Sequence, residues 1–412
     1  MKILMVHNYY RENGGEETVF AAESALLWEY GHDVIPYTED NRQASGESPW
    51  VAGMNAVWSR RSQRALGRLL EEKRPDVVHF HNTFLRISPA AYYTCQEHGV
   101  PVVQTLHNYR PLCPAATFFR DGHVCEECLG RTITTPAVVH GCWHGSRAQS
   151  LAPAAMVSVH RAFGTWQKQV DLYVALSEFS RRKFIAGGFP ADKIAIKPNF
   201  VAPDPGEGSG DGRFALFAGR LSAEKGVPTL LDAWKRLAGR IPLVIAGDGP
   251  LAGLVQQATR DDPAVRWLGS LPHAQLIELI GQASFLVFPS ECYENFPLVL
   301  VESFACGRPV LATDLGAAAE IVDDGRLGLH FHAGDAADLA GKAAWACDHP
   351  AQMAEMGRQA RSEYEEKYTA EDNYRRLMDL YERATKSRGR AARARADGGN
   401  QRPPSIAKGH SS

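Results

Sequence analysis

The chain alternates short, continuously apolar runs with longer helical patterns, and this alternation limits the folds open to it. Such runs are typical of strands buried on both faces, because those strands have no polar side. Six precede residue 200: "KILMVHN", "DVIPYTE", "DVVHFHN", "PVVQTLHN", "LYVALS" and "IAIKPN". Five follow it: "FALFAGR", "PLVIAGDG", "VRWLGS", "SFLVFPS" and "PVLATD". Strands separated by helices predict an α/β protein built from Rossmann-like, doubly wound parallel sheets.

A segment rich in proline, glycine and acidic residues interrupts the pattern once. This segment, "FVAPDPGEGSGDGR" at 200–213, has almost no core-forming side chains and predicts a linker. It separates a first domain at 1–199 from a second at 214–369. A helical pattern at 370–385 follows, and then a basic tail at 386–412. We expect the tail to be disordered, because it has few apolar residues beyond alanine.

Bulk properties exclude several classes of protein. The 412 residues carry a formal net charge of −2, which gives no overall attraction to nucleic acid. No apolar segment reaches the ~20 residues that a membrane-spanning helix needs. The first residues lack the apolar stretch and cleavage site of a signal peptide. We therefore expect a cytoplasmic protein, in a compartment where disulfides are rare.

Ligands of open α/β sheets bind beyond the carboxyl ends of the strands, so the residues that follow each run are the candidates. Gly14 and Gly15 follow the first run and precede a helix, where backbone N–H groups can meet an anion or form a tight turn. His107 stands where a later strand ends, whereas His79 and His81 lie within the strand before it. Each of the three histidines can be structural, but the position of His107 at the end of a strand favours a functional role for it.

The second domain places charged residues at two strand ends. Arg220 ends "FALFAGR", and Lys225 follows it and precedes a helix. Two cations at a strand end favour a binding site for a diphosphate over two unrelated surface cations. Glu294 follows "SFLVFPS", and Glu302 stands in the apolar helical run "LVLVESFA". A carboxylate in such surroundings needs hydrogen-bond donors, which local backbone or a polyhydroxyl ligand can supply. We expect one glutamate to bind a sugar ring and the other a ribose.

The second half of the chain resembles a known family. The segments "AGRLSAEKG", "VIAGDGPL", "WLGSLP", "ENFPLVLVESFACGRPVLAT" and "GAAAEIVDDGRLGL" resemble, in order and spacing, the donor domain of the family 4 retaining glycosyltransferases. The likeness covers about residues 1–385, is strongest over 214–330, and is looser for "GGEETVF" and "LHNY". It implies the GT-B fold, in which two Rossmann-like domains face each other across a cleft.

The resemblance implies roles for individual residues. Glu294 corresponds to the residue that contacts the transferred sugar, and Glu302 to the one that binds the ribose of the nucleotide. Arg220 and Lys225 correspond to the pair on the donor diphosphate. His107 corresponds to a histidine near the donor sugar.

The resemblance is less complete at two loops. Gly15 corresponds to the glycine loop that faces the donor phosphate and the acceptor. Many family members have glycines after the first glutamate, where this chain has Asn295 and Pro297. Since proline has no N–H, Asn295, Phe296 and Leu298 must supply any backbone donors there.

The resemblance also implies the substrates and the chemistry. The donor is a UDP- or GDP-sugar, and the acceptor is a glycan or a lipid-linked sugar in cell-surface polysaccharide biosynthesis. The chain has no Asp-x-Asp motif, so we expect no metal cofactor for catalysis, with cations and helix N-termini stabilising the leaving group. The alternative is an inactive nucleotide- or glycan-binding protein of the same fold. A dinucleotide-dependent oxidoreductase would need Gly-x-Gly-x-x-Gly after an early strand, and "HNYYRENGG" lacks it.

Four cysteines cluster in a predicted insertion at about 110–145. Cys125 and Cys128 form a Cys-x-x-Cys pair, which Cys113 and Cys142 flank. This pattern is typical of a metal site, so a structural zinc, a redox pair and free thiols are the three interpretations. Part of the segment, "FFRDGHVCEEC", predicts a small hairpin.

Two segments could contact a membrane. The stretch at 50–74 mixes tryptophans and leucines with arginines, as an interfacial helix or an ordinary amphipathic core helix would. The basic tail could also meet anionic lipid or be a solvated flexible tail. Peripheral contact would place the protein at the inner face of the cytoplasmic membrane.

Overall fold

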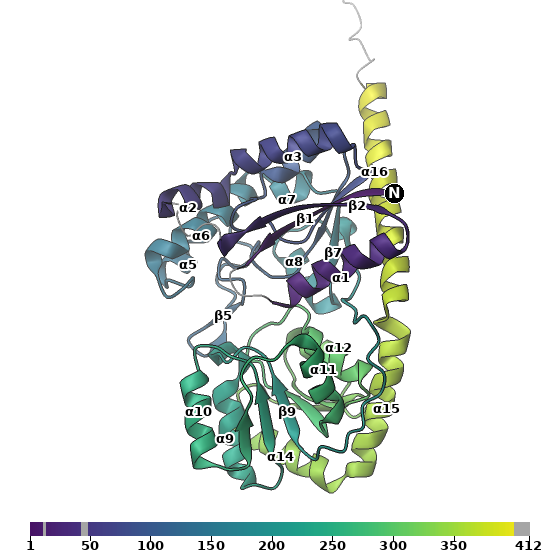
Figure 1. Ribbon diagram of the computed structural model, residues 1–412. Helices are drawn as coiled ribbons and strands as arrows, with labels where there is room; N and C mark the ends of the chain where they lie inside the picture. The colour runs from purple at the N-terminus through teal and green to yellow at the C-terminus, as the bar shows by residue number, and fades with distance from the viewer. Residues whose placement is uncertain (11–13, 43–47, 399–412) are drawn as a thin grey trace, which may run out of the picture.

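Two parallel sheets, one in each half of the chain, form the centre of the molecule (Figure 1). The computed structural model describes residues 1–10, 14–42 and 48–398. The first sheet has the order β2-β1-β3-β4-β7-β8, and its strands are β1 (Lys2–Tyr9), β2 (Asp33–Asp40), β3 (Val77–Phe80), β4 (Val102–Thr105), β7 (Leu172–Ala175) and β8 (Ile194–Ile196). The second has the order β11-β10-β9-β12-β13-β14, and its strands are β9 (Ala215–Ala218), β10 (Leu243–Ala246), β11 (Val265–Trp267), β12 (Phe285–Phe288), β13 (Val310–Thr313) and β14 (Gly328–Phe331). These are the two doubly wound parallel-sheet domains that the alternating pattern predicts.

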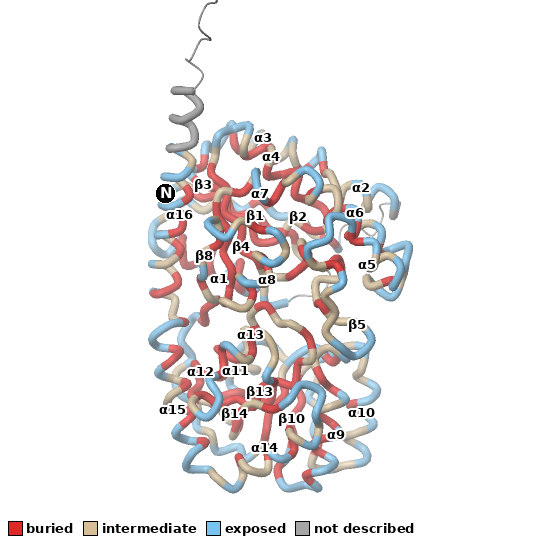
Figure 2. The backbone as a smooth tube through the Cα atoms, turned by 180° about the vertical axis from the view of Figure 1, so that it is seen from behind, coloured by how far each residue is buried: buried red, intermediate tan, exposed pale blue. Residues whose placement is uncertain are grey.

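Helices cover both faces of each sheet. Those of the first domain are α1 (Gly15–Glu29), α2 (Pro49–Val57), α3 (Arg60–Lys73), α4 (Ala91–Glu97), α5 (Thr135–Val139), α6 (Arg147–Ala162), α7 (Thr165–Lys168) and α8 (Glu178–Ala186). Those of the second are α9 (Val227–Leu237), α10 (Ala252–Asp261), α11 (His273–Gln282), α12 (Leu298–Ala305), α13 (Gly316–Ile321), α14 (Ala336–Asp348) and α15 (Pro350–Lys367). Buried residues concentrate along the strands and the inner helix faces (Figure 2). The strand ends, and the loops that follow them, are therefore held by a rigid interior.

All eleven predicted runs contain a strand at the expected place, but β14 was not predicted. Its sequence, "GLHF", is short and carries a half-buried histidine, and it lies at the sheet edge beside β13. A Cβ on Gly328 would overlap the carbonyl oxygen of Val310 on β13, so glycine allows the close pairing. An edge strand of this kind lacks the continuous apolar run on which the prediction depends.

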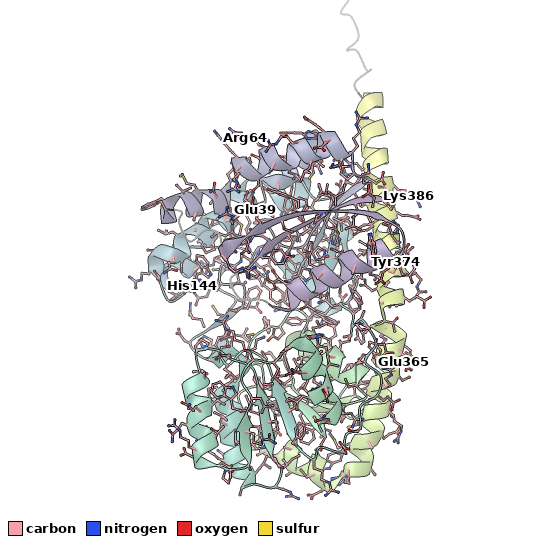
Figure 3. All side chains as sticks on the ribbon, viewed as in Figure 1. Glu39, Arg64, His144, Glu365, Tyr374 and Lys386 are labelled. Atoms are coloured by element: carbon pink, nitrogen blue, oxygen red, sulfur yellow. The ribbon has the colours of Figure 1, made fainter. Side chains whose placement is uncertain are left out.

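The C-terminal helix is longer than predicted and belongs to the first domain. Helix α16 (Ala370–Gly398) runs from the end of α15 along the side of the first domain, as the positions of Glu365, Tyr374 and Lys386 show (Figure 3). Its residues Leu377, Leu380 and Tyr381 pack with Ile3 and Val103 of the first sheet. The prediction of a helix at 370–385 followed by disorder is thus wrong for 386–398. Residues 399–412 lie outside the described part.

The extended helix has a physical explanation. Residues 386–398 are rich in alanine and arginine, which have high helix propensities. Arg388, in the segment predicted to be disordered, donates to the carbonyl oxygen of Gln96 at 3.0 Å and lies 3.8 Å from Asp171. These contacts attach the helix beyond 385 to the first domain.

The two domains contact each other beside the cleft. The carboxylate of Glu320, on α13, accepts from the backbone N–H groups of Glu178 (2.6 Å) and Phe179 (2.5 Å), which open α8. The negative charge therefore lies at the positive end of a helix in the opposite domain. This contact connects the domains independently of the linker and of α16.

Candidate active site between the two domains

Two cations stand beyond the end of β9, as predicted. Arg220 is exposed two residues after the strand, and Lys225 ends a 3₁₀ turn, η3 (Ala223–Lys225). Gly226 follows in the left-handed region, at φ 69°, and a Cβ there would overlap the carbonyl oxygen of Pro289. Glycine thus lets the turn lie directly against the end of β12. This close approach brings Lys225 beside the loop that carries Glu294.

Glu294 is held by an ion pair and a hydroxyl. Its Oε1 lies 2.5 Å from Lys225 Nζ and accepts from Ser290 Oγ at 2.7 Å. Burial acts to raise the pKa of Glu294, but the charge and the hydrogen bond of Lys225 outweigh it and lower the pKa. Burial likewise acts to lower the pKa of Lys225, and the charge of Glu294 raises it above the ordinary value. Both groups are therefore charged at neutral pH, and the carboxylate keeps acceptor positions for ligand hydroxyls.

Glu302 is buried in the second turn of α12, with 4 % of its surface exposed. Its Oε1 lies 2.8 Å from Nε2 of His273, at the start of α11. The hydrogen bond to Glu302 raises the pKa of His273, and partial burial opposes the rise. The start of α12 itself offers backbone N–H groups, because Leu298 opens the helix after Pro297. A carboxylate and a helix N-terminus thus belong to the same short element.

The loop that carries Glu294 docks on the first domain. Asn295, with 7 % of its surface exposed, donates through Nδ2 to the carbonyl oxygen of Leu106, just beyond β4. Tyr109 Oη donates to the carbonyl oxygen of Glu294 at 3.3 Å, and Ser177 Oγ donates to that of Asn295 at 3.3 Å. The loop is therefore fixed against the end of the strand that precedes His107. The role of the Asn295 side chain was missed, because nothing local in the sequence names its partner.

His107 belongs to a buried polar network. Its Nε2 lies 2.8 Å from His81 Nδ1, and His81 Nε2 lies 3.4 Å from Glu23 Oε2. Glu23 Oε1 is 2.5 Å from Lys197 Nζ, and both of these side chains are at most 1 % exposed. Burial lowers the pKa of His107 well below its usual value, with smaller contributions from the electrostatic interactions with His7 and Lys197. His107 is therefore a neutral imidazole at neutral pH.

The network also assigns the protons of these rings. The carboxylate of Glu23 favours a proton on His81 Nε2, so His81 Nδ1 is the acceptor and His107 Nε2 the donor. His79 lies in the same cluster. Its Nδ1 is hydrogen-bonded to Tyr381 Oη (2.8 Å) and its Nε2 to Thr105 Oγ1 (2.7 Å). His79 and His81 thus have structural partners, and His107 is the histidine at the strand end.

Gly14 and Gly15 open α1 beyond the end of β1. The N–H of Gly14 donates to Glu17 Oε2 at 2.7 Å, so it is engaged in capping the helix, which the turn interpretation of the sequence allowed. A Cβ on Gly15 would meet no heavy atom within 4 Å, so there is open space beside it. Residues 11–13 of the same loop lie outside the described part. Gly15 therefore fits an approaching ligand better than Gly14 does.

Glu16 is a candidate that the sequence reasoning missed. Its Oε2 accepts from Asn108 Nδ2 at 3.1 Å, and Asn108 directly follows His107. Its Oε1 is buried without a hydrogen-bond partner. Burial, and then the charge of Glu17, raise the pKa of Glu16 to about 8. Its position directly after Gly15 could have marked Glu16 as a candidate. Acidic residues in the first turn of a helix are common, however, because they interact favourably with the helix dipole.

Two hollows lie near these residues. A cavity of about 40 Å³ borders His81, His107, Asn108 and Arg110 at the carboxyl ends of β3 and β4. A larger groove of about 550 Å³ follows the linker and reaches the site at His273. We assign the chemistry to the strand ends rather than to the groove, because the charged and hydrogen-bonded groups converge there.

The four clustered cysteines border one small cavity in the insertion between β4 and α6. Cys113, Cys125, Cys128 and Cys142 line one cavity of about 20 Å³. The predicted hairpin is confirmed, as β5 (Phe119–Arg120) pairs antiparallel with β6 (His123–Val124). All eight cysteines are free thiols in the structure, which describes every one of them.

Comparison with known proteins extends these observations. Residues 7–205 match the family described as Glycosyltransferase Family 4, and residues 212–349 match Glycosyl transferases group 1. The chain is 28% identical over 356 residues to glycogen synthase from Mycobacterium tuberculosis, which covers 84% of this chain and 75% of that protein. It is 31% identical over 209 residues to phosphatidyl-myo-inositol mannosyltransferase from Mycobacterium leprae, covering 48% of this chain and 54% of that one.

A solved structure shows the same arrangement of domains. Anabaena Alr3699/HepE, solved in complex with UDP, aligns with a TM-score of 0.66 at 17% identity, over 92% of this chain and 99% of that one. The matches to the two families together span both sheets and the cleft between them. The chain therefore belongs to the group 1, family 4 glycosyltransferases and has the GT-B fold.

Proposed function

We propose that this glycosyltransferase moves a sugar from a UDP- or GDP-sugar to a glycan or lipid-linked acceptor in cell-surface polysaccharide biosynthesis, with retention of configuration. One observation carries the proposal: the loop that bears the Lys225–Glu294 ion pair is docked, through Asn295 and Leu106, on the strand end before His107. Charged groups of one domain thereby face the polar strand ends of the other. A nucleotide sugar is a ligand with matching parts, namely hydroxyls, a diphosphate and a ribose.

The proposed donor lies along α12. Glu302 accepts from the ribose hydroxyls, and Glu294 accepts from the hydroxyls of the transferred sugar. The N–H groups at the start of α12 meet the diphosphate between them. His107 approaches the sugar from the first domain as a neutral imidazole, and the open space beside Gly15 accommodates the phosphate and the acceptor.

The proposed leaving group is stabilised without a metal. Departure of the nucleoside diphosphate places negative charge on its terminal phosphate, while the sugar becomes oxocarbenium-like. Lys225 is charged at neutral pH, and Arg220 stands five residues before it at the same strand end. Cations and helix dipoles that are already in place cost no reorganisation when the charge develops.

The configuration of the sugar is retained if the acceptor attacks from the same face of the ring that the leaving group departs from. Glu294 is already bound to Lys225 and Ser290, which suits a hydrogen-bond acceptor better than a nucleophile. Burial, and then the charge of Glu294, raise the pKa of the neighbouring Cys292 to about 12, so this thiol is protonated at neutral pH. The acceptor hydroxyl is therefore the proposed nucleophile, with the departing phosphate taking its proton.

The acceptor class is proposed by analogy with the relatives. Glycogen synthase is named for a glycan, and phosphatidyl-myo-inositol mannosyltransferase is named for a lipid acceptor. The proposed location is the cytoplasm, at the inner face of the membrane. Among the described residues, no helix is long and apolar enough to cross a bilayer.

Part of the first domain fits peripheral contact with that membrane. Helices α2 and α5 both contact α6, at the edge of the domain opposite α16 (Figure 1). This edge exposes the large apolar side chains Trp50 (79 %), Met54 (64 %), Ile133 (69 %), Val139 (52 %) and Leu151 (50 %). The segment at 50–74 is therefore divided, because Leu66 and Leu70 on α3 are buried in the core.

We expect hydrolysis of at least one sugar nucleotide from a panel of UDP- and GDP-sugars, and a lower kcat/KM for that donor when either glutamate is changed. Glu294→Gln should lower kcat by about two orders of magnitude, roughly 2.7 kcal/mol of barrier, because it weakens a contact to the reacting sugar. Glu302→Gln should mainly raise the donor KM, because the ribose does not react.

Glu355→Gln is the matched control, since Glu355 is an exposed carboxylate on α15 of the same domain. Wild-type kinetics in both site variants would show that the two glutamates are misassigned. Binding of a nucleotide sugar with no turnover of any donor or acceptor would favour the inactive binding protein instead.

Transfer should persist when EDTA is added at the start of the assay, because Arg220 and Lys225 take the place of a metal. The measurement is the initial rate with EDTA, with added Mg²⁺, and with neither. A rate that requires added Mg²⁺ or Mn²⁺ would contradict the proposal.

Donor KM should fall as the pH rises through the raised pKa of His273, because His273 loses its proton and releases Glu302 for the ribose. The hydrogen bond to Glu302 raises the pKa of His273, so the cation that occupies Glu302 is present below that pKa and lost above it. His273→Gln should flatten the pH dependence of KM and leave kcat unchanged. His332→Gln is the control, as His332 also has a raised pKa but pairs with Asp338. An unchanged KM profile in His273→Gln would refute this role.

Trp50→Ser combined with Met54→Ser should reduce binding to vesicles that contain phosphatidylglycerol, since these side chains would enter the interface. Trp28→Ser is the control, because Trp28 is 73 % exposed on α1, away from this edge. Vesicle co-sedimentation measures the bound fraction. Equal binding by all three proteins would exclude this edge as the contact.

A further inference from the structure

The insertion between β4 and α6 is anchored by Leu112 and Phe118, which are buried in the core of the first domain, but it has little regular structure of its own. Its regular elements are the two-residue strands β5 and β6 and the five-residue helix α5. Away from this anchor the apolar cluster around its cysteines is small: Cys128 and Ala137 pack on Ala154 of α6, with Val138 and Cys142 against them. A segment with so small a core usually needs a disulfide or a metal ion to fold stably.

The cysteines converge on one point of this insertion. Cys113, Cys125, Cys128 and Cys142 all border the same cavity, whose volume of about 20 Å³ is room for one water-sized sphere. They come from three separate loops, with eleven, two and thirteen residues between successive cysteines. A single small space that all four cysteines border fits one shared ligand better than two independent disulfides.

Two arginines lie beside the cysteine loops. Arg161 holds the loops in place, and Arg120 has an N–H group that could donate to a thiolate. Arg161, on α6, donates to the carbonyl oxygens of Cys128 (3.0 Å) and Pro111 (3.1 Å). Arg120 borders the cavity, and its Nη1 is buried without a hydrogen-bond partner. A metal bound to four thiolates carries excess negative charge, so nearby N–H groups that donate to the sulfurs stabilise it. The cavity thus has both the ligands and a charge partner.

The thiols must move inward to bind an ion. Among the described residues, the groups whose ligand atoms already lie within 4.8 Å of one another are Glu23 with His79 and His81, and His7 with Glu16 and Glu17. Four sulfurs around a tetrahedral zinc lie at about 2.3 Å from the metal and about 3.8 Å from each other. The cysteine loops therefore have to tighten around the ion, and this tightening is the step that would order them.

We propose that Cys113, Cys125, Cys128 and Cys142 bind one zinc ion as a closed structural site. Thiolate is a soft ligand that selects zinc over the hard cations, and four protein ligands leave no open position for catalysis. The other free cysteines, such as Cys95 and Cys347, stand apart from the cavity. The zinc belongs to the scaffold and is separate from the leaving-group chemistry proposed above.

The proposed zinc site would affect the active site through side-chain packing. Phe118 lies 6.0 Å from Tyr293, ring centre to ring centre, and Tyr293 directly precedes Glu294. Glu126, next to Cys125, is 2.5 Å from Lys183 Nζ, and that amine lies 4.6 Å above the Tyr293 ring. The insertion thus supports the loop that carries Glu294. Loss of the ion should disorder the insertion first and slow transfer as a consequence.

Zinc content is the direct test. The full chain, purified without chelator from zinc-supplemented cells, should contain about one zinc per chain by elemental analysis. Cys125→Ser and Cys128→Ser should each lose most of it, while Cys347→Ala on α14 should keep it. Limited proteolysis should then cut the two zinc-poor variants within 110–145 and leave the control intact there.

A second measurement needs no variant and covers the case in which the variants fail to fold. An organomercurial added to the native wild-type chain should release the zinc as it modifies four thiols, detected with a colorimetric zinc indicator. Zinc content near zero, with the four thiols alkylated freely in the native protein, would overturn the proposal. Two disulfides among these cysteines by peptide mass mapping, or equal zinc in the wild type and in Cys125→Ser, would overturn it as well.

Discussion

The contact between Asn295 and Leu106 is the constraint on which the site depends. The groups proposed for catalysis come from two domains, and each domain positions only its own strand ends. The amide of Asn295 is buried in the interface, where an unpaired polar group would cost free energy. Its bond to the carbonyl oxygen of Leu106, together with the Tyr109 hydroxyl on Glu294, therefore fixes one loop across the cleft. The Glu320 carboxylate at the start of α8 adds a second, electrostatic contact between the same domains.

The two sides of the cleft carry different electrostatic properties. On the second domain, Lys225 and Glu294 stabilise each other's charged forms against burial, so the site keeps a fixed cation and a fixed anion. On the first domain, burial lowers the pKa of His79 and of His7 to about 4, and His107 is likewise neutral. Phosphate chemistry needs fixed charge near the leaving group, and a sugar needs neutral or acceptor groups. The division suits a ligand that has both an anionic part and polyhydroxyl parts.

Much of the fold followed from local patterns. Buried parallel strands need continuous apolar runs, so each of the eleven predicted strands could be located, and the hairpin within "FFRDGHVCEEC" was predicted as well. Edge strand β14 escaped because its residues are not continuously apolar. Helix α16 was predicted too short because the tail has few apolar residues beyond alanine, whereas Arg388 meets a partner almost 300 residues earlier in the chain. In both cases the missing information was a contact distant in sequence.

The sequence alone determined which residues could do chemistry: cations and carboxylates at strand ends, a histidine after β4, and four cysteines in one insertion. It could do so because strand ends and residue types are local properties. Only the tertiary structure decided how they combine, including the pairing of Lys225 with Glu294, of Glu302 with His273, and of His107 with a chain of groups that ends at Lys197. The physical reason is that a charge state, a tautomer or a buried hydrogen bond depends on neighbours in space. The chain brings those neighbours from separate elements, and in the case of Asn295 and Leu106 from separate domains.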